Sequence, residues 1–300
     1  MASQKSWLAT RAEYTLAATL VTSLRSLPLA VANRVATAAA SLLDAALPKL
    51  RRVARINLAF AFPQLGPAER ERLIDEVFQN IARMLVAIAR FPDLNASNIG
   101  DWISYEGLEY YREAKRAGRG VLIATAHLGN WELSAFAHAL LTEPMNVMVR
   151  PLDNTLIDKL VENRRTLSGN RLIYKRDGAR AVLRALRNNE AVGILIDQNT
   201  AAAEGVFVDF FNAPACANLG FVKLAHHSGA PVIPGFAVWD SAQARYVLHF
   251  YPPVPMTGNE AADTQHLHSV MEDIIRRYPG QWMWIHRRWK TRPPGSPALY

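Results

Sequence analysis

Apolar side chains in the first 60 residues recur at intervals of three and four positions, as they do between Tyr14 and Leu24. This spacing predicts α-helices with one apolar face, because residues three and four apart share one side of a helix. Pro28 breaks the first helix, and a second helix rich in Ala and Leu is expected over 30–47. The N-terminal region is therefore predicted to be helical.

A clearer helical repeat lies between Pro67 and Pro92. Its apolar residues recur with a period close to 3.6 residues, at Ile74, Phe78, Ile81, Leu85 and Ile88. Proline suits the first turn of a helix and prevents a helix from continuing. We therefore expect one long helix between these two prolines.

From about residue 119 the pattern changes to short apolar runs separated by helical stretches. The expected strands are 120–126, 146–150, 172–174, 191–197, 206–211, 231–238 and 246–251. The expected helices are 131–141, 153–168, 179–188, 221–228 and 262–277. This alternation is typical of an α/β fold with a mostly parallel mixed sheet covered by helices. We predict a helical membrane-interface region over 1–66 and an α/β domain over 67–300.

The net charge of the chain indicates which kinds of partner it could bind. Lys and Arg outnumber Asp and Glu by 34 to 26, so the chain is basic and is attracted to nucleic acid, anionic lipid or an acidic protein. A basic run follows the second predicted helix, at Lys49, Arg51, Arg52 and Arg55. An apolar helical region that ends in such a run suits an anionic membrane surface. The alternative is a helix packed on the body with a solvated basic face.

Membrane association is expected to be peripheral or shallow. A helix needs about 20 apolar residues to cross a bilayer, and Arg25, Arg34 and Asp44 interrupt the best candidate segment. No cleavable signal peptide is expected. The single Cys216 excludes an internal disulfide. The histidine pairs 226–227 and 266/268 lack a convincing third ligand, so no metal site and no cofactor are expected.

The segment most indicative of chemistry is TAHLGNWE, residues 125–132. His127 follows a predicted strand, and open α/β sheets bind ligands at the carboxyl ends of their strands. Gly129 permits a sharp turn, and Asn130 suits the N-cap of the next helix. Glu132 then lies in the first turn, where it can face the imidazole and leave one ring nitrogen free as a base. Alternatively, Glu132 only complements the helix dipole and His127 only caps a loop.

These two residues match the His-x4-Asp/Glu signature of glycerolipid and lipid A acyltransferases. Over most of its length the chain resembles the lipid A biosynthesis acyltransferases, the lauroyl and myristoyl transferases of Gram-negative bacteria. The resemblance lies in the blocks RINLAFAFPQLGPAER, MVRPLDNTLIDKL, LIDQN, VFVDFF, SGAPVIP and QWMWIHRRWKTRPP, taken in this order. It implies an O-acyltransferase in which His127 is the general base and Glu132 is its orienting partner.

The resemblance also implies a set of residues that bind substrate. Arg165, or the adjacent Arg164, is expected to hold the phosphate of the acceptor or a developing oxyanion. Without the resemblance, a basic helix face is the simpler interpretation of this pair. Arg150 is expected to bind a substrate phosphate or to pair with an acid. Asp197 matches an acidic position of the family, and it either orients His127 or Arg165 or caps the loop that follows.

The implied reaction moves a fatty acyl group from acyl carrier protein to a hydroxyl of a lipid A precursor, at the cytoplasmic face of the inner membrane. One alternative keeps the chemistry with an acyl-coenzyme A donor and another acceptor, such as a phosphatidylinositol mannoside or a lysophospholipid. A lower-ranked alternative is a non-catalytic membrane-surface protein of the same fold. A serine esterase is not expected, because the chain lacks a Gly-x-Ser-x-Gly motif. The sequence departs from the family at Asp209, Asn212 and Ala217, and this bears on the acceptor.

The C-terminal run interleaves Trp282, Trp284 and Trp289 with basic residues. Such a run can stack on nucleic acid or lie among lipid headgroups. It can also be a buried strand followed by a basic tail. The resemblance favours a structural strand near the site with a tail that faces lipid or the carrier, and no nucleic-acid partner.

Overall fold

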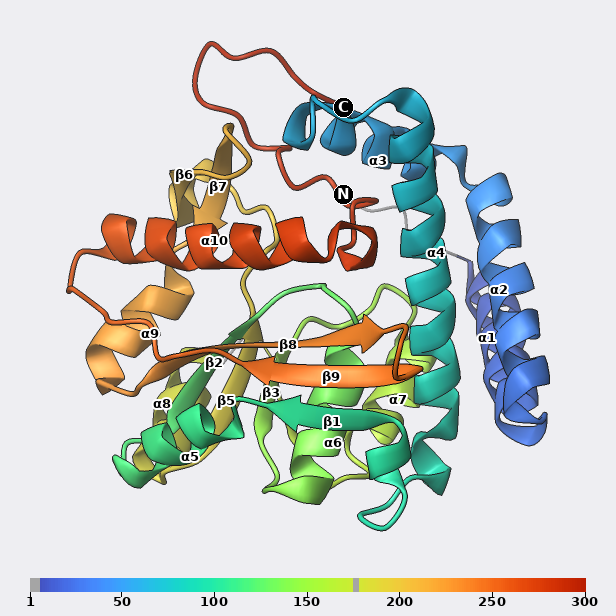
Figure 1. Cartoon of the computed structure of the whole chain (residues 1–300), viewed down its shortest axis with the longest axis horizontal. Coiled ribbons are helices and arrows are strands. Elements are labelled where there is room, and N and C mark those ends of the chain that lie inside the picture. The colour runs from blue at the N-terminus through green and yellow to red at the C-terminus, as the bar shows by residue number, and fades with distance from the viewer. Residues whose placement is uncertain (1–5, 175–177) are drawn as a thin grey trace.

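The computed structural model describes residues 6–174 and 178–300, and Figure 1 shows its arrangement. Four helices come first along the chain: α1 (Trp7–Ser26), α2 (Leu29–Ala46), α3 (Pro48–Ala61) and α4 (Pro67–Arg90). Residues 1–5 of the predicted helical region lie outside the described residues. The prolines that open α3 and α4 occupy the first helical position, where no backbone N–H is needed. The predicted break at Pro28 and the long helix after Pro67 are confirmed.

The rest of the chain alternates strands with helices. The strands are β1 (Ile103–Glu106), β2 (Val121–Thr125), β3 (Asn146–Val149), β4 (Arg171–Tyr174), β5 (Ala191–Leu195), β6 (Gly205–Asp209), β7 (Pro214–Asn218), β8 (Val232–Asp240) and β9 (Arg245–Phe250). The helices are α5 (Leu108–Arg116), α6 (Trp131–Leu141), α7 (Thr155–Arg165), α8 (Gly178–Arg187), α9 (Gly220–Ser228) and α10 (Glu260–Arg277). The sequence did not predict β1, α5 or β7.

Seven strands form one sheet in the order β1-β9-β8-β2-β5-β3-β4. Every neighbouring pair is parallel except β8 and β9, so the predicted mostly parallel mixed sheet is confirmed. Strands β6 and β7 form a separate antiparallel hairpin. The central strands β2 and β5 are apolar along nearly their whole length because helices cover both faces of the sheet.

Alternate residues of β2 show what covers each face. Ile123 packs in the same core as Leu133 and Phe136 of α6. Leu122 faces the other way and packs in a core that includes residues of α8 and α9. Since successive side chains of a strand point to opposite faces, Thr125 shares the α6 face with Ile123. This α6 face of the sheet adjoins the candidate site.

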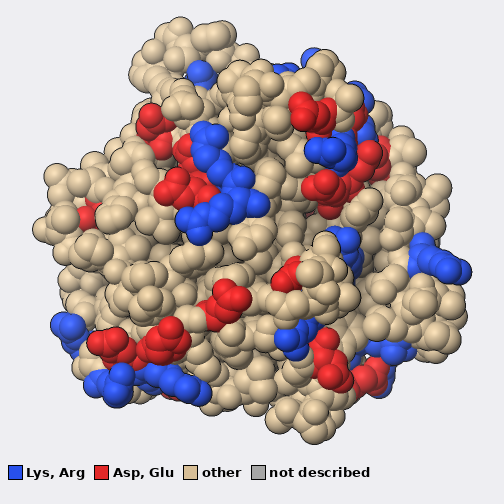
Figure 2. Space-filling view, viewed as in Figure 1, with Lys and Arg blue, Asp and Glu red and all other residues tan. Residues whose placement is uncertain are grey.

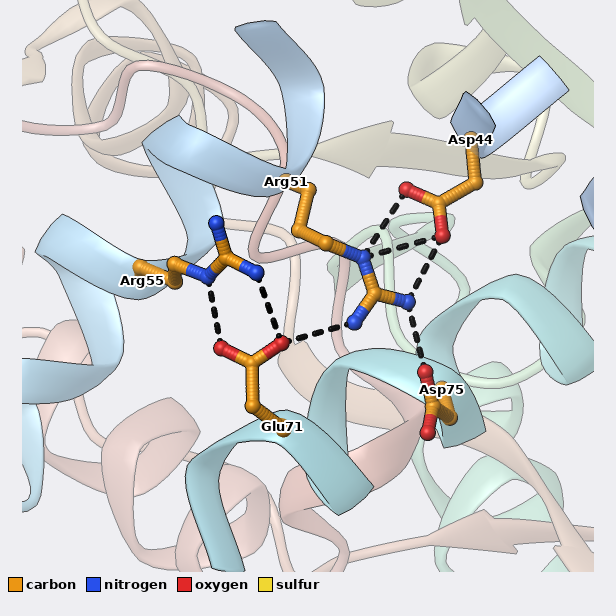
Figure 3. Close-up of polar contacts among 5 residues, drawn as sticks. All are labelled: Asp44, Arg51, Arg55, Glu71 and Asp75. Atoms are coloured by element: carbon orange, nitrogen blue, oxygen red, sulfur yellow. Dashed lines mark hydrogen bonds and ion pairs between the residues drawn. The ribbon is translucent and has the colours of Figure 1, made fainter. Parts of the chain in front are cut away.

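The basic run predicted to meet a membrane is only partly free to do so (Figure 3). Arg51 donates to Asp44 at the end of α2, with distances from 2.6 to 3.0 Å, and to two acidic residues of α4. Arg55 donates to Glu71 of α4 at 2.6 and 3.0 Å. We call these five residues, Asp44, Arg51, Arg55, Glu71 and Asp75, the Arg51 cluster. Two of the four basic residues in the run therefore hold helices together.

The other two basic residues of that run, Lys49 and Arg52, are exposed. On the face shown in Figure 2, basic and acidic side chains lie beside one another with wide uncharged areas between them. The net charge therefore does not form a single basic patch on that face. Among the described residues, no helix is both long and apolar enough to span a bilayer.

The prediction of a strand near the C-terminus is wrong. Residues 282–289 form turns, and only Trp282 pairs in the β manner, through an isolated bridge to Leu128. Local bonds replace a ladder: the Trp284 N–H donates to the Trp282 carbonyl at 2.8 Å. The turns let Trp282, Trp284 and Trp289 all lie fully buried in the core beneath the N-terminal helices.

Candidate active site

His127 lies in the short connection between β2 and α6. Gly129 makes the turn with φ of +62°, and a Cβ there would lie only 1.8 Å from the Ala237 carbonyl oxygen, so only glycine fits. Asn130 caps α6, since its side-chain oxygen accepts from the Leu133 N–H at 2.9 Å. The backbone that follows His127 is thus fixed by residues that the motif supplies.

Asp197 holds the imidazole of His127. Its Oδ1 lies 2.8 Å from His127 Nδ1, and its Oδ2 accepts the His127 backbone N–H at 2.8 Å. A third donor is the indole N–H of Trp282, also at 2.8 Å from Oδ2. The two residues meet because β2 and β5 are parallel neighbours, so the loops that leave their carboxyl ends lie side by side. Asp197 is fully buried, so these contacts replace its lost hydration.

The electrostatics of this pair favour a proton on Nδ1. Burial alone would lower the pKa of His127, but the charge of Asp197 and its hydrogen bond outweigh burial and raise it. Burial would likewise raise the pKa of Asp197, but the field and hydrogen bond of His127 hold that pKa below its ordinary value. With Nδ1–H donated to Asp197, the lone pair lies on Nε2. The amide nitrogen of Gln198, an exposed residue, lies 3.3 Å from Nε2.

Glu132 is placed beside Arg165 rather than against His127 Nδ1. The Nε of Arg165 donates to Glu132 Oε2 at 2.8 Å, and a second bond joins its Nη2 to Oε1. The indole N–H of Trp131 also donates to Glu132, at 3.2 Å. The negative charge of Glu132 still contributes to the raised pKa of His127. The direct orienting contact predicted for Glu132 is therefore made by Asp197, and the catalytic role of Glu132 stays a prediction.

The remaining predicted residues separate into different surroundings. Arg164 donates to the backbone carbonyls of Ile88 and Ala89, at 3.2 and 2.7 Å, and so satisfies acceptors in the last turn of α4. Arg165, and not Arg164, is the arginine that the structure brings to the site. Arg150 follows β3 directly and is exposed.

Three residues of the site were not assigned a role from the sequence. Trp282 bonds to Asp197 across 85 positions, a separation that no local spacing reveals. Trp131 packs its ring edge-on to the His127 ring, with centroids 4.8 Å apart. Gln198 lies beside Nε2 of the imidazole. One signal in the sequence indicated a role for Trp131 and Gln198, which is that they lie next to predicted site residues. For Trp282 the signal was its place in the aromatic run near the C-terminus.

An apolar pocket adjoins the imidazole between α6 and the sheet. Its lining includes Ile123 and Thr125 of β2, Gly193 and Leu195 of β5, and Trp131 and His138 of α6. Thr125 and Trp131 flank His127 in sequence, so this end of the pocket lies at the site. Among residues 6–174 and 178–300, no group of three or more His, Cys, Asp or Glu side chains is arranged to hold a metal ion.

Comparison with known proteins agrees with the resemblance found in the sequence. Residues 2–291 match the family described as bacterial lipid A biosynthesis acyltransferase. The lipid A biosynthesis palmitoleoyltransferase of Escherichia coli (strain K12) is 32% identical over 265 residues, covering 85% of this chain and 84% of that protein. The lauroyltransferase of the same organism is 30% identical, covering 85% of each. The myristoyltransferase is 26% identical, covering 83% of this chain and 78% of that protein.

The chain belongs to the bacterial lipid A biosynthesis acyltransferase family. It is therefore an enzyme that transfers acyl groups, and the non-catalytic alternative is disfavoured.

Proposed function

We propose that this enzyme transfers a fatty acyl group from the thioester of acyl carrier protein to a hydroxyl of a lipid A precursor. The observation that carries the proposal is the buried His127–Asp197 pair, with Nδ1 bonded to Asp197, Nε2 beside the exposed Gln198, and an apolar pocket lined by the neighbouring Thr125 and Trp131. Family membership supports a lipid A acceptor. The basic chain suits an acidic carrier protein as the donor.

In the proposed reaction, Nε2 of His127 takes the proton of the acceptor hydroxyl as its oxygen attacks the thioester carbonyl carbon. The resulting imidazolium is stabilised by Asp197, which keeps Nδ1–H bonded throughout. The tetrahedral intermediate then collapses, the carbon–sulfur bond breaks, and the sulfur leaves as the thiol with the proton from Nε2. The products are an ester and the free carrier thiol, and no cofactor or acyl-enzyme is required.

Glu132 and Arg165 have a supporting role in this proposal. The two bonds from Arg165 to Glu132 fix the guanidinium near the imidazole and leave other N–H groups for an anionic substrate. Those groups suit a phosphate of the acceptor or the oxyanion of the intermediate. The exposed Arg150 is a further candidate for a substrate phosphate. Arg164, whose guanidinium caps α4, positions α7 and does not bind substrate in this proposal.

The apolar pocket is the proposed site of the acyl chain. Its end at Thr125 and Trp131 adjoins His127, so a chain that enters there would place its thioester carbonyl by the imidazole. Burial of each methylene group stabilises the bound chain by about 0.8 kcal/mol.

The N-terminal helices are the proposed membrane contact, at the cytoplasmic face of the inner membrane. In α1, Trp7, Leu8 and Leu16 are between 65% and 74% exposed, an unusual state for large apolar side chains. The exposed Lys49 and Arg52 would meet anionic headgroups, at about 1 kcal/mol each. We propose 1–66 as the membrane-interface region and 67–300 as the catalytic domain.

Membrane binding is tested with vesicles of neutral lipid containing an anionic fraction. Replacement of both Lys49 and Arg52 by Ala is expected to weaken binding about 30-fold, because two favourable charges are lost. The matched control replaces two exposed arginines of α8, Arg180 and Arg187, and should leave binding unchanged. Equal binding by both double variants would refute this surface.

The donor and acceptor are tested by mass spectrometry of the reaction products. Purified enzyme receives acyl carrier protein or coenzyme A thioesters of one acyl group, together with a lipid A precursor or a lysophospholipid. The proposal expects one added acyl unit on the lipid A precursor, formed faster from the carrier protein. Acylation of the lysophospholipid alone would favour the alternative acceptor class, and transfer from coenzyme A alone would overturn the donor assignment.

A further inference from the structure

The apolar pocket has one end beside the site and the other in the core. Thr125 and Trp131 line the first end, where the Trp131 ring packs against the imidazole. His138 lies seven residues after Trp131 on α6, so the pocket extends about 10 Å along this helix. At that depth the lining residues Leu248 and Phe250 of β9 are at most 4% exposed. The pocket therefore ends inside the protein.

The wall at the closed end is rigid. His138 bonds through Nδ1 to the Tyr105 hydroxyl at 3.1 Å, and its ring packs edge-on to Tyr111 with centroids 4.5 Å apart. Phe250 stacks on both tyrosines, with centroids 6.0 and 5.4 Å away. Burial lowers the pKa of His138 to about 4, so the imidazole is neutral at physiological pH. These closely packed rings cannot move aside to accommodate a longer acyl chain.

Two flexible methionines, Met145 and Met148, line the pocket, and Met145 is the buried one. An ideal Cβ on Gly193 would lie 2.7 Å from the terminal methyl of Met145, so this methyl rests where Gly193 has no side chain. Gly193 pairs with Ile123 of β2 and Val147 of β3, which places it in the centre of the sheet, two residues along the strands from the level of Thr125. Methionine is unbranched and has three rotatable bonds, so its end can shift where the ring cluster cannot.

We propose that Met145 and Gly193 together set the length of the acyl chain that this enzyme transfers. The inference rests on the proposed use of the pocket as the acyl site. Met145 limits the depth available to the chain terminus, and the missing side chain at Gly193 gives the Met145 methyl its place. The pair thus selects the donor by length, while His127 and Asp197 perform the transfer.

The proposal predicts opposite shifts for two substitutions. Met145→Ala removes the flexible side chain and should raise the preferred length by about two carbons, with about a tenfold change in the ratio of the two products. Gly193→Ala forces the Met145 methyl away from the sheet and into the pocket, so the preference should move to shorter chains. The backbone at Gly193 has no positive φ, so alanine is compatible with its conformation.

The experiment offers full-length enzyme an equimolar mixture of saturated acyl carrier protein thioesters of increasing even chain length, with a lipid A precursor as acceptor. Mass spectrometry gives both the total product and its distribution over chain lengths. Met271→Ala is the matched control, because Met271 is equally buried but lies in the core around α10, away from the pocket. This control should lose comparable stability and keep the wild-type distribution.

The outcomes separate the two proposals. Opposite shifts in the two pocket variants, with an unchanged control, support the inference. Normal total transfer with the wild-type distribution in both pocket variants overturns the inference but leaves the proposed function intact. No transfer by the wild-type enzyme overturns the proposed function itself. If Met145→Ala does not fold, Gly193→Ala and Met145→Leu still test the inference. An unchanged distribution of product chain lengths in both variants refutes the length-setting role.

Discussion

The His127 site and the Arg51 cluster both join carboxylates to nitrogen donors, but they differ in burial and in the donor. At the site, Asp197 is fully buried and His127 is 13% exposed. In the cluster, Arg51 is 20% exposed and its partner Asp75 is 57% exposed. The donor at the site is an imidazole, which gains and loses a proton near neutral pH, whereas a guanidinium stays charged.

The comparison teaches that similar bond geometry serves two purposes. In the Arg51 cluster, two fixed positive charges of α3 meet acids from α2 and α4, so the contacts tie helices together at any ordinary pH. At the site, one acid is surrounded by donors, and only one of them can change its charge. We therefore expect substitutions at the site to change rate and those in the cluster to change stability.

The largest effect is expected for His127→Ala. Removing the proposed base should lower the acyl transfer rate by roughly 10²–10⁴-fold, the usual contribution of general-base catalysis. Circular dichroism and vesicle binding should match the wild type, because the backbone N–H of residue 127 and the Trp282 indole still donate to Asp197. Retained turnover would show that the imidazole is not the base. The His127 site would then no longer differ in purpose from the Arg51 cluster.

A smaller effect is expected for Glu132→Gln. This change removes the charged partner of Arg165 but keeps Asp197 on the imidazole. We expect the acceptor KM to rise by roughly tenfold, as for loss of a charge-assisted bond, with a smaller change in kcat. Steady-state kinetics with varied acceptor concentration would measure this split. A fall in kcat as large as that of His127→Ala would instead support the orienting role first predicted for Glu132.

The smallest effect on turnover is expected for Arg51→Met. The free energy of unfolding should fall by about 1–2 kcal/mol, since several partly exposed contacts between helices are lost, while kcat of the folded enzyme stays unchanged. Denaturant unfolding measures the first quantity. Arg52→Ala is the control, because this exposed side chain should contribute less than about 0.5 kcal/mol.

The cluster also has a pH signature. Hydrogen bonds from Arg55 and, to a smaller extent, from Arg51 outweigh the opposing effect of burial and lower the pKa of Glu71 to about 2. A carboxylate with a lowered folded pKa stabilises the fold above its unfolded pKa, and this contribution is lost as pH falls toward the folded value. The difference in stability between wild type and Arg51→Met should therefore shrink below about pH 4.5.

Much of the fold could be predicted from local pattern. Helix α6 was expected over 131–141, and these are its observed bounds. The missed strand β1 has only four residues at the edge of the sheet, and β7 begins with a proline and consists mainly of small residues. Neither has an apolar run that stands out in the sequence. The position of β1 also depends on pairing with β9 near the other end of the chain, which periodicity does not reveal.

The site was predictable to the extent that it is local. His127 and Glu132 lie in one motif, and Asp197 lies just beyond a strand that the sequence predicts, so all three were named. The sequence did not show which carboxylate would bond to Nδ1 of His127. The bond to Asp197 joins residues 70 positions apart, and it forms because β2 and β5 are neighbouring strands. The burial of the C-terminal tryptophans, and the bond from Trp282, depend on tertiary packing in the same way.

The central claim is that Asp197 holds His127 as the catalytic base, and the most direct measurement is the pH dependence of kcat/KM for Asp197→Asn. The charge of Asp197 raises the pKa of His127, so its loss should move the acid limb of the profile to lower pH. The plateau should fall by roughly 10²–10⁴-fold, because the imidazole loses its tautomer and orientation. If Asp197→Asn kept the wild-type plateau of kcat/KM and the wild-type position of the acid limb, the claim that Asp197 holds His127 as the base would be contradicted.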